Sequence, residues 1–224
     1  MAEITEFKES SYVRSFKKLR IANLFERNAN FRKLRRKNTF WKEISEAMAV
    51  RERIKDYLIK DPSYIVIDAC SGKGFLSTIV GLMHPKTKIL AVDRDEEADR
   101  EHFKSLKNVE FVNMDIMSDD FSKLVKESGQ RVILTGIHLC RELSERFIEV
   151  VNSCENVKTA VLIPCCEGNF PREKYQFLID ELGVYEAWCY YLKEKFDENL
   201  KVKMKRDKKI LSPKNIVLAA ERNG

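Results

Sequence analysis

From Tyr64 onwards, short apolar runs alternate with amphipathic segments of helical length, and this alternation limits the fold more than any other feature. The runs are rich in Val, Ile and Leu and occupy 64–69, 88–92, 109–112, 131–137 and 159–163. Helices fit between them at 74–83, 95–106, 119–128 and 141–153. Strands that are apolar throughout, each followed by a crossover helix, are typical of a parallel sheet covered on both faces. The sequence therefore predicts an α/β fold.

The N-terminal part of the chain has a different pattern. Apolar residues such as Val13 and Phe16 recur at helical spacing, with Lys and Arg on the opposite face. The Asp61-Pro62 pair ends the last helix, because proline disfavours helical backbone at the residue before it. We therefore divide the chain into a basic helical extension, 1–60, and a sheet domain, 61–224.

The C-terminal part is predicted to close the sheet. After a further helix at 171–182, we expect two strands, 184–192 and 214–221, with the basic stretch 193–210 between them. Consecutive strands with no helix between them indicate an antiparallel hairpin at the edge of the sheet.

Charge is distributed unevenly along the chain. The formal net charge is +6 for 224 residues. The segment Arg14–Lys37 contains ten bases and one acid, and Lys193–Lys209 contains eight bases and four acids, so the remainder is acidic. Basic segments on an acidic body favour a polyanionic partner, and we expect RNA to bind through these two segments.

The cysteines and the apolar runs indicate in which cellular compartment the protein is expected. None of the six cysteines forms a C-x-x-C pair, so we interpret them as free thiols in a reducing environment. No apolar run approaches the roughly 18 residues of a spanning helix, and the first ten residues lack the apolar centre of a signal peptide. We expect a soluble, cytoplasmic protein without membrane contact, and leave its oligomeric state open.

Acidic residues follow three successive strands of the predicted sheet. The first strand leads through Asp68 into Cys70-Ser71-Gly72-Lys73-Gly74, where a helix begins. A glycine-rich turn lets the backbone approach a ligand and directs helix amides at it. The second strand ends in Asp93, where an acid can accept hydrogen bonds from ribose hydroxyls, and Asp115 follows the third strand. These residues predict a nucleotide-like cofactor site at the carboxyl edge.

This pattern resembles the cofactor site of the class I S-adenosylmethionine-dependent methyltransferases. The resemblance covers about 64–221 and implies a Rossmann-like, seven-stranded, mostly parallel sheet with an antiparallel terminal strand. It also implies S-adenosyl-L-methionine as cofactor. The cofactor-binding residues that it implies are Asp68, Cys70, Ser71, Gly72, Gly74, Asp93, Arg94, Asp115 and Ile116.

Within this resemblance, Asp68 and the turn surround the methionine part, Asp93 binds the ribose and Asp115 binds the adenine amino group. Cys70 stands where the family often has a first glycine, so we expect a less tight turn or a Cys70 side chain that points away from the ligand.

A nicotinamide-dependent Rossmann domain would share the glycine turn and the ribose acid. Its G-x-G-x-x-G pattern is not satisfied, because Ser77 occupies the third glycine position. An acid after the third strand also has no role in such a domain, so we favour the methyltransferase interpretation.

A second group of residues follows the fourth and fifth strands. His138-Leu139-Cys140 and Pro164-Cys165-Cys166, taken in order with the first motif, resemble a narrower group that includes eukaryotic tRNA 2′-O-methyltransferases acting near the acceptor end. That group typically has glycine after His-x-Cys, where this chain has Arg141, and it carries zinc-finger segments that we do not find here.

Four interpretations of these side chains remain open. In the first, the side chains only pack the site. In the second, His138 orients or deprotonates a hydroxyl acceptor. In the third, Cys165 attacks a pyrimidine carbon as RNA cytosine-5 methyltransferases do, and in the fourth the side chains bind zinc. Their spacing matches no standard zinc motif, and we predict no metal. The candidate catalytic residues are His138, Cys140 and Cys165.

The aromatic residues among the N-terminal bases, Phe16, Phe25 and Phe31, either stack on unpaired bases or pack on the sheet domain, and we favour packing. The stretch Arg32–Lys37, with five bases in six residues, favours a polyanionic partner.

The favoured function is methylation of RNA, tRNA included, at a ribose 2′-hydroxyl rather than cytosine C5. The alternatives are a small-molecule methyltransferase with a helical lid and a non-catalytic nucleic-acid-binding module.

Overall fold

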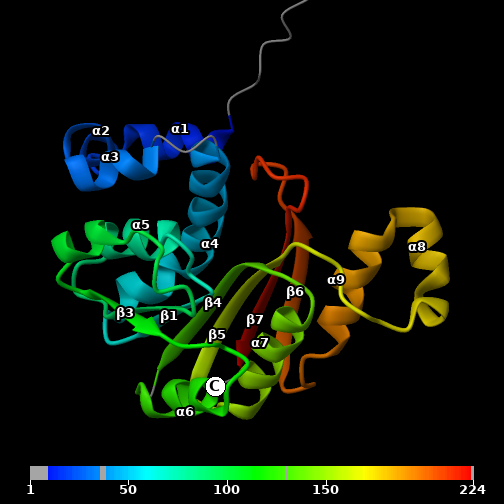
Figure 1. The fold of residues 1–224 in the computed structure, drawn as a ribbon. Coiled ribbons are helices and arrows are strands. Elements are labelled where there is room, and N and C mark those ends of the chain that lie inside the picture. The colour runs from blue at the N-terminus through cyan, green and yellow to red at the C-terminus, as the bar shows by residue number, and fades with distance from the viewer. Residues whose placement is uncertain (1–9, 36–38, 130, 223–224) are drawn as a thin grey trace, which may run out of the picture.

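The computed structural model describes residues 10–35, 39–129 and 131–222. Its centre is one seven-stranded sheet with the order β3-β2-β1-β4-β5-β7-β6 (Figure 1). The strands are β1 Ile65–Ala69, β2 Ile89–Asp93, β3 Val109–Asn113, β4 Val132–Leu139, β5 Val157–Pro164, β6 Leu200–Arg206 and β7 Ile216–Arg222. Strands β1 to β5 are parallel, and β7 is antiparallel to both of its neighbours. The predicted mostly parallel sheet with an antiparallel terminal strand is confirmed.

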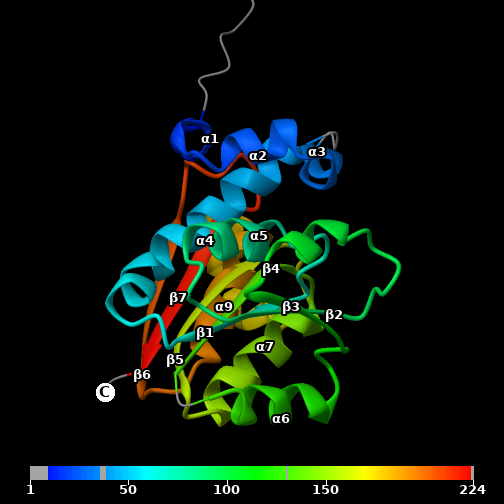
Figure 2. The same cartoon turned by 90° about the vertical axis from the view of Figure 1, so that its left-hand side faces the viewer.

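Helices cover both faces of this sheet, so the molecule has three layers (Figure 2). The helices are α1 Ser11–Lys18, α2 Ala22–Arg27, α3 Ala29–Arg35, α4 Phe40–Lys60, α5 Phe75–Met83, α6 Asp119–Glu127, α7 Glu142–Ser153, α8 Gln176–Leu182 and α9 Val184–Glu194. One apolar core lies between the sheet and α4 and α5, and a second lies between the sheet and α6, α7 and α9. Strands β1, β2, β4 and β5 are therefore buried from both sides, as their apolar sequences require, whereas the edge strand β3 is only partly buried.

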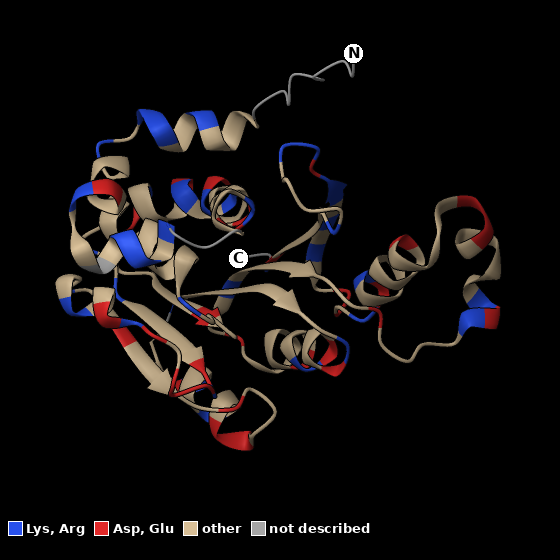
Figure 3. Ribbon diagram, turned by 45° about the horizontal axis from the view of Figure 1, so that its top comes forward, with Lys and Arg blue, Asp and Glu red and all other residues tan. Residues whose placement is uncertain are grey.

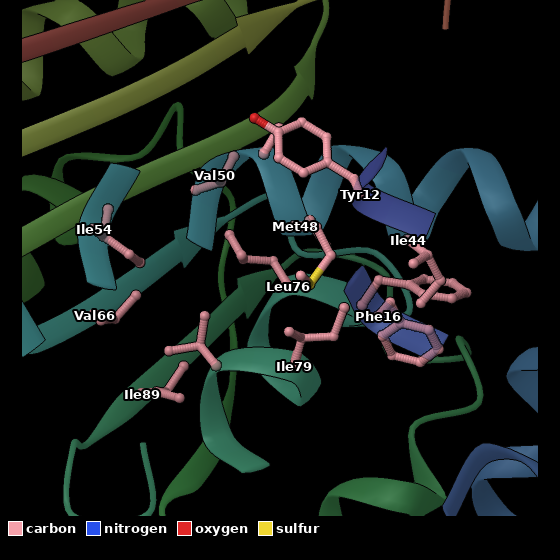
Figure 4. Close-up of a cluster of buried hydrophobic side chains, with 14 of the residues drawn as sticks. Tyr12, Phe16, Ile44, Met48, Val50, Ile54, Val66, Leu76, Ile79 and Ile89 are labelled. Carbon is pink, nitrogen blue, oxygen red and sulfur yellow. The ribbon is translucent and has the colours of Figure 1, made fainter. Parts of the chain in front are cut away.

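The N-terminal helices share the first of these cores. Phe16 and Phe25 are 1% and 0% exposed, and their rings meet edge to face with centroids 5.3 Å apart. Figure 4 shows Tyr12 and Phe16 of α1 against Ile44 and Met48 of α4. Phe31 is also buried, so the expectation that the aromatic residues of this segment pack rather than face solvent is confirmed.

The C-terminal hairpin is held against the N-terminal helices by polar contacts. The Tyr12 hydroxyl donates to Asp207 Oδ2 over 2.7 Å, and Arg53 Nη2 lies 3.0 Å from the same oxygen. The Ser10 hydroxyl also donates to the backbone oxygen of Lys209. The loop after β6 and the start of α1 are therefore neighbours, although about 200 residues separate them in sequence.

Two predictions for the C-terminal part, the strand 184–192 and the connection 193–210, were wrong. The predicted strand 184–192 is helix α9, because Val184, Ala187, Trp188 and Leu192 recur at helical spacing and the last three are buried. The actual strand β6 lies within the stretch 193–210 that we expected to connect two strands. Its sequence LKVKMKR alternates with a period of two, which is the pattern of a strand. The hairpin at the sheet edge is therefore present, but it begins at Leu200.

The predicted helix 95–106 is also largely absent. Only a short 3-10 helix, Glu101–Ser105, forms there. The Asp95 carboxylate accepts backbone N–H groups of Glu97 and Ala98, and such local bonds compete with helix formation. A second 3-10 helix, Arg172–Tyr175, precedes α8 where one continuous helix was predicted. In the part of the chain that the structure describes, no helix combines the length and apolar character needed to cross a membrane.

The shared core leads to a stability prediction. Phe16→Ala should lower the free energy of unfolding by about 3–5 kcal/mol, because it removes a fully buried ring. It should shift the whole denaturant transition, measured by circular dichroism, rather than produce a separate early step.

The matched control is Phe177→Ala on α8. The Phe177 side chain is 75% exposed, so this substitution should change stability by no more than roughly 0.5 kcal/mol. Equal effects of the two substitutions would show that α1 does not contribute to the main core.

Candidate active site

A cavity of about 300 Å³ opens at the carboxyl ends of β1 and β4. It is bounded by α4, by the turn after β1 and by the end of β4. The lining residues are Glu43, Asp68, Cys70, Ser71, Gly72, Lys73, Phe75, Leu76, Asp95, Ala98, Ile137 and His138. Strands β2 and β3 lie on one side of β1, and the next strand in the chain, β4, lies on its other side. Ligands of open α/β sheets bind at such a switch point in the strand order.

The turn after β1 has the backbone of a glycine-rich loop. Cys70, Gly72 and Gly74 have left-handed backbones with φ of 54°, 53° and 70°. A Cβ atom at Gly74 would lie 2.1 Å from the Phe103 ring, so a larger residue would have to displace this ring and adopt a strained left-handed backbone. Cys70 adopts the conformation that a glycine would, and it lines the cavity. The expectation of a less tight turn, or of a Cys70 side chain that points away from the ligand, stays a prediction.

Asp93 at the end of β2 fixes this turn. Its Oδ2 accepts the Gly72 N–H over 2.7 Å, and its Oδ1 accepts the Asp95 N–H over 2.9 Å. Arg100 supports the same arrangement, because its guanidinium donates to the backbone oxygens of Gly72 and Asp95, each over 2.6 Å. The guanidinium carbon lies 4.0 Å from the centre of the Phe111 ring.

Asp68 is the buried acid of the cavity. Its side chain is nearly inaccessible and accepts a hydrogen bond from the Ser77 hydroxyl over 2.7 Å. Burial, with a smaller contribution from the Asp93 charge, raises the pKa of Asp68 to about 7. A cationic ligand group placed here would favour the ionised carboxylate.

A second cavity of about 190 Å³ neighbours the first, and Cys70 lines both. Its lining residues are Cys70, Asp93, Arg94, Asp115, Ile116 and Leu143. Arg94 Nη1 lies 3.4 Å from Asp115 Oδ2, and Ile116 and Leu143 supply apolar surface. The two cavities thus lie side by side at the carboxyl ends of the strands, with Cys70 in the wall of both.

His138 is directed into the first cavity by an irregularity in β4. The register with β5 shifts between Ile137 and Leu139, and His138 has a left-handed backbone with φ of 60°. Bulges of this kind redirect side chains next to active sites. As a result, His138 lines the cavity while Leu139 is fully buried.

Glu46 of α4 lies beside this histidine. Glu46 Oε2 is 2.9 Å from His138 Nε2, although the two atoms are not aligned as a hydrogen bond. The Glu46 side chain is 0% exposed, and neither carboxylate oxygen has a hydrogen-bond partner among the described residues. A buried carboxylate without hydrogen bonds is costly, so its retention points to a role in the site.

The candidate catalytic cysteines lie behind His138. Cys140 and Cys165 both donate to the His138 backbone oxygen, and their sulfur atoms are 2.6 Å apart. Burial and the neighbouring thiols raise the pKa of Cys165 well above its ordinary value. His138 lines the first cavity, but Cys140 and Cys165 are not among the described residues that line it.

Of the nine cofactor-binding residues that the sequence predicted, eight line one or both of two neighbouring cavities, and Gly74 caps the start of α5 beside them. Sequence reasoning missed Glu46, Arg100 and Leu143. Glu46 had one usable signal, because it is the only acid within the otherwise apolar or small stretch 44–50. No sequence signal pointed to Arg100 or Leu143, because each meets site residues that are distant in sequence.

The N-terminal basic segment contacts the start of α4, the helix that carries part of the cavity wall. Lys17 and Arg35 lie over the Trp41 ring, 4.9 and 5.1 Å from its centre, and Trp41 is two residues from Glu43 in the cavity wall. Lys33 is paired with Asp99 and Glu101, so its charge is compensated within the molecule. Arg36 and Lys37 lie outside the described residues.

Comparison with known proteins gives the family. The sequence model of a family described as "Methyltransferase domain" matches residues 39–173, more than half of the chain. No curated protein matches the chain in sequence.

Several solved structures share the fold. The plantazolicin methyltransferase BpumL in complex with S-adenosylhomocysteine is 14% identical with a TM-score of 0.51, and the match covers 95% of this chain and 98% of that one. The methyltransferase domain of bacterial CtHen1-CN is 16% identical with a TM-score of 0.51, covering 81% and 100%. A fibrillarin pre-rRNA processing protein of Methanococcus jannaschii is 10% identical with a TM-score of 0.54, covering 73% and 68%. These likenesses agree with the family match, and the chain belongs to the methyltransferase family whose domain model it matches.

Proposed function

We propose that this chain is an S-adenosylmethionine-dependent methyltransferase that modifies RNA, tRNA included, at a ribose 2′-hydroxyl. The observation that carries the proposal is the His138–Glu46 pair, an imidazole 2.9 Å from a buried carboxylate and facing the same cavity as Asp68. An imidazole held in this way is suited to accept the proton that a hydroxyl loses on methylation.

The two neighbouring cavities support the assignment of the donor. In this proposal Asp68 faces the ammonium of the methionine part, Asp93 accepts from the ribose hydroxyls, and Asp115 with Ile116 binds the adenine. Each oxygen of Asp93 already accepts one backbone N–H but retains capacity for a further donor. When bound, the donor supplies an electrophilic methyl group on a sulfonium.

The charge distribution supports an RNA acceptor. Figure 3 shows Lys and Arg along α1 and along the C-terminal hairpin, which contact one another through Tyr12 and Asp207. On β6 the side chains of Lys201, Lys203 and Lys205 are all exposed. Two basic segments distant in sequence therefore flank the N-terminal half of α4, which carries Glu43 in the cavity wall and Glu46 beside His138. A polyanion bound there would have one nucleotide near His138.

The competing functions have less support. A helical lid over a small-molecule site would need α1 and α3 to move, but their buried residues Phe16 and Phe31 are part of the main core. A Cys165 nucleophile would need to reach the acceptor, yet its side chain is 9% exposed and enclosed by Cys140 and the His138 backbone. All the cysteines are free, which supports a reducing compartment such as the cytoplasm.

The first prediction concerns pH and the donor site. Because burial raises the pKa of Asp68 to about 7, a ligand ammonium beside it should drive ionisation and release a proton. The affinity for S-adenosylhomocysteine should therefore rise between pH 5.5 and about 7 and level off above. Calorimetry at pH 7 in buffers of different ionisation enthalpy should give release of roughly half a proton per site.

Asp68→Asn should weaken binding and remove this pH dependence. If the wild-type affinity does not change across that pH range, Asp68 does not face the ammonium.

The second prediction concerns the proton acceptor. His138→Ala should reduce turnover by roughly 10²–10⁴-fold, the usual contribution of a general base, without loss of S-adenosylhomocysteine binding. Glu46→Gln should also reduce turnover, because it removes the charge beside the imidazole. His84→Ala serves as the control, since His84 caps the far end of α5.

Near-wild-type turnover of His138→Ala would rule out His138 as the base. If Cys165→Ser instead abolishes turnover and the wild type forms a covalent adduct with 5-fluorocytosine RNA, the acceptor is a cytosine carbon.

The third prediction concerns the RNA surface. The exposed bases Arg14, Lys18 and Arg20, replaced together by Gln, should weaken RNA binding and lower the slope of log affinity against log salt by roughly 2–3. A matched triple variant of Lys86, Lys107 and Lys126, exposed at the opposite edge of the sheet, should leave both quantities unchanged. Equal losses in the two variants would mean that RNA binds through overall charge rather than through α1.

A further inference from the structure

Three cysteine sulfur atoms meet behind the candidate active site. Cys140 follows β4, and Cys165 and Cys166 follow β5. The Cys140 sulfur lies 2.6 Å from that of Cys165 and 3.5 Å from that of Cys166, and the latter two are 3.7 Å apart. All three atoms therefore lie within 4.8 Å of one another.

The fold holds these residues in place without help from the thiols. Strands β4 and β5 are parallel neighbours whose last register pair is Leu139 with Pro164, so Cys140 and Cys165 follow at the same level. Beyond them, the Arg141 N–H donates to the Cys166 backbone oxygen over 3.2 Å and ties the two loops together. The three side chains thus start from a preorganised backbone.

The spacing suits a common cation. Three thiolates bound to one zinc ion, each at about 2.3 Å in a tetrahedral arrangement, lie roughly 3.8 Å apart. Two of the three sulfur separations are already within about 0.3 Å of this value, and the third has to lengthen. Thiolate ligands select soft cations such as zinc over magnesium or calcium. The sequence alone predicted no metal here, because the ligands come from two strands and their spacing matches no standard motif.

Exposure differs among the three ligands. Cys165 is buried, Cys140 is partly buried and Cys166 is exposed. A cation bound by them would be held from the protein side and open towards solvent at Cys166. Three protein ligands with an open fourth position distinguish such a site from a closed structural zinc site.

We propose that Cys140, Cys165 and Cys166 form a three-thiolate zinc site with an open fourth coordination position, adjacent to but separate from the cofactor cavities. Binding forms three zinc–sulfur bonds and releases three S–H protons to the solvent, with no change of oxidation state.

The test uses the full-length protein, reduced and freed of metal, titrated with Co²⁺ as a spectroscopic probe. Wild type should bind one equivalent, with a thiolate-to-cobalt charge-transfer band in the near ultraviolet of the intensity expected for three thiolates. Zinc should displace the cobalt stoichiometrically, whereas magnesium should not. This readout is independent of methyl transfer, so its failure leaves the proposed function untouched.

Variants locate the site. Cys166→Ala should keep the fold, because Cys166 is exposed, and should weaken zinc binding by more than the roughly 10–100-fold that loss of a second-shell partner costs. Cys165→Ala should do the same where it folds. Cys154→Ala is the control, since Cys154 is buried at the other end of β5 and should leave binding intact.

Three results would overturn the proposal: no charge-transfer band in the reduced wild type, unchanged zinc affinity in Cys166→Ala, or equal loss in Cys154→Ala. A Cys140–Cys165 disulfide that forms readily in a protein without affinity for zinc would also overturn it and identify the cluster as a redox pair.

Discussion

The bond from the Gly72 N–H to Asp93 is the interaction on which the candidate site depends. It joins the turn after β1 to the end of β2, and Arg100 holds the same turn from the other side through the Gly72 backbone oxygen. These contacts stabilise left-handed backbone at Cys70, Gly72 and Gly74, which a non-glycine residue adopts only at some cost. Because the turn separates the two cavities, its position decides whether they form one continuous site. In our proposal the cofactor lies across this turn.

The N-terminal helices contribute to the site as well as to the core. Helix α4 carries Glu46 next to His138, and α1 is fixed to α4 by buried aromatic rings. A carboxylate buried without hydrogen bonds is tolerated only where the surrounding core is rigid, and the packing of α1 supplies that rigidity. The same packing places Lys17 of α1 over Trp41 at the start of α4, the helix that carries Glu43 of the cavity wall. Stability, the candidate catalytic pair and the proposed RNA surface are therefore coupled through one helix.

Much of the site could be predicted from the sequence because topology fixes it. Parallel strands bring Asp68, Asp93 and Asp115 to one edge, whatever the details of packing. Contacts that depend on tertiary structure could not be predicted in this way. Glu46 looks like an ordinary helical acid until α4 is packed on β4. In β6, four basic residues in seven made the segment look like a charged connection although apolar residues alternate with them. In α9, the aromatic residues suggested a strand, although the buried residues follow helical spacing. The sulfur cluster required the β4–β5 register, including its shift at His138.

The most direct measurement of the central claim is product identification. The protein would be incubated with S-adenosylmethionine carrying a labelled methyl group and with total RNA, and the RNA digested to nucleosides for mass spectrometry. The account predicts label in a 2′-O-methylated nucleoside, whose neighbouring phosphodiester bond resists alkaline hydrolysis, and a rate of labelling roughly 10²–10⁴-fold lower when His138 is replaced by Ala. Label on a base, or label in a metabolite fraction with unlabelled RNA, would contradict it.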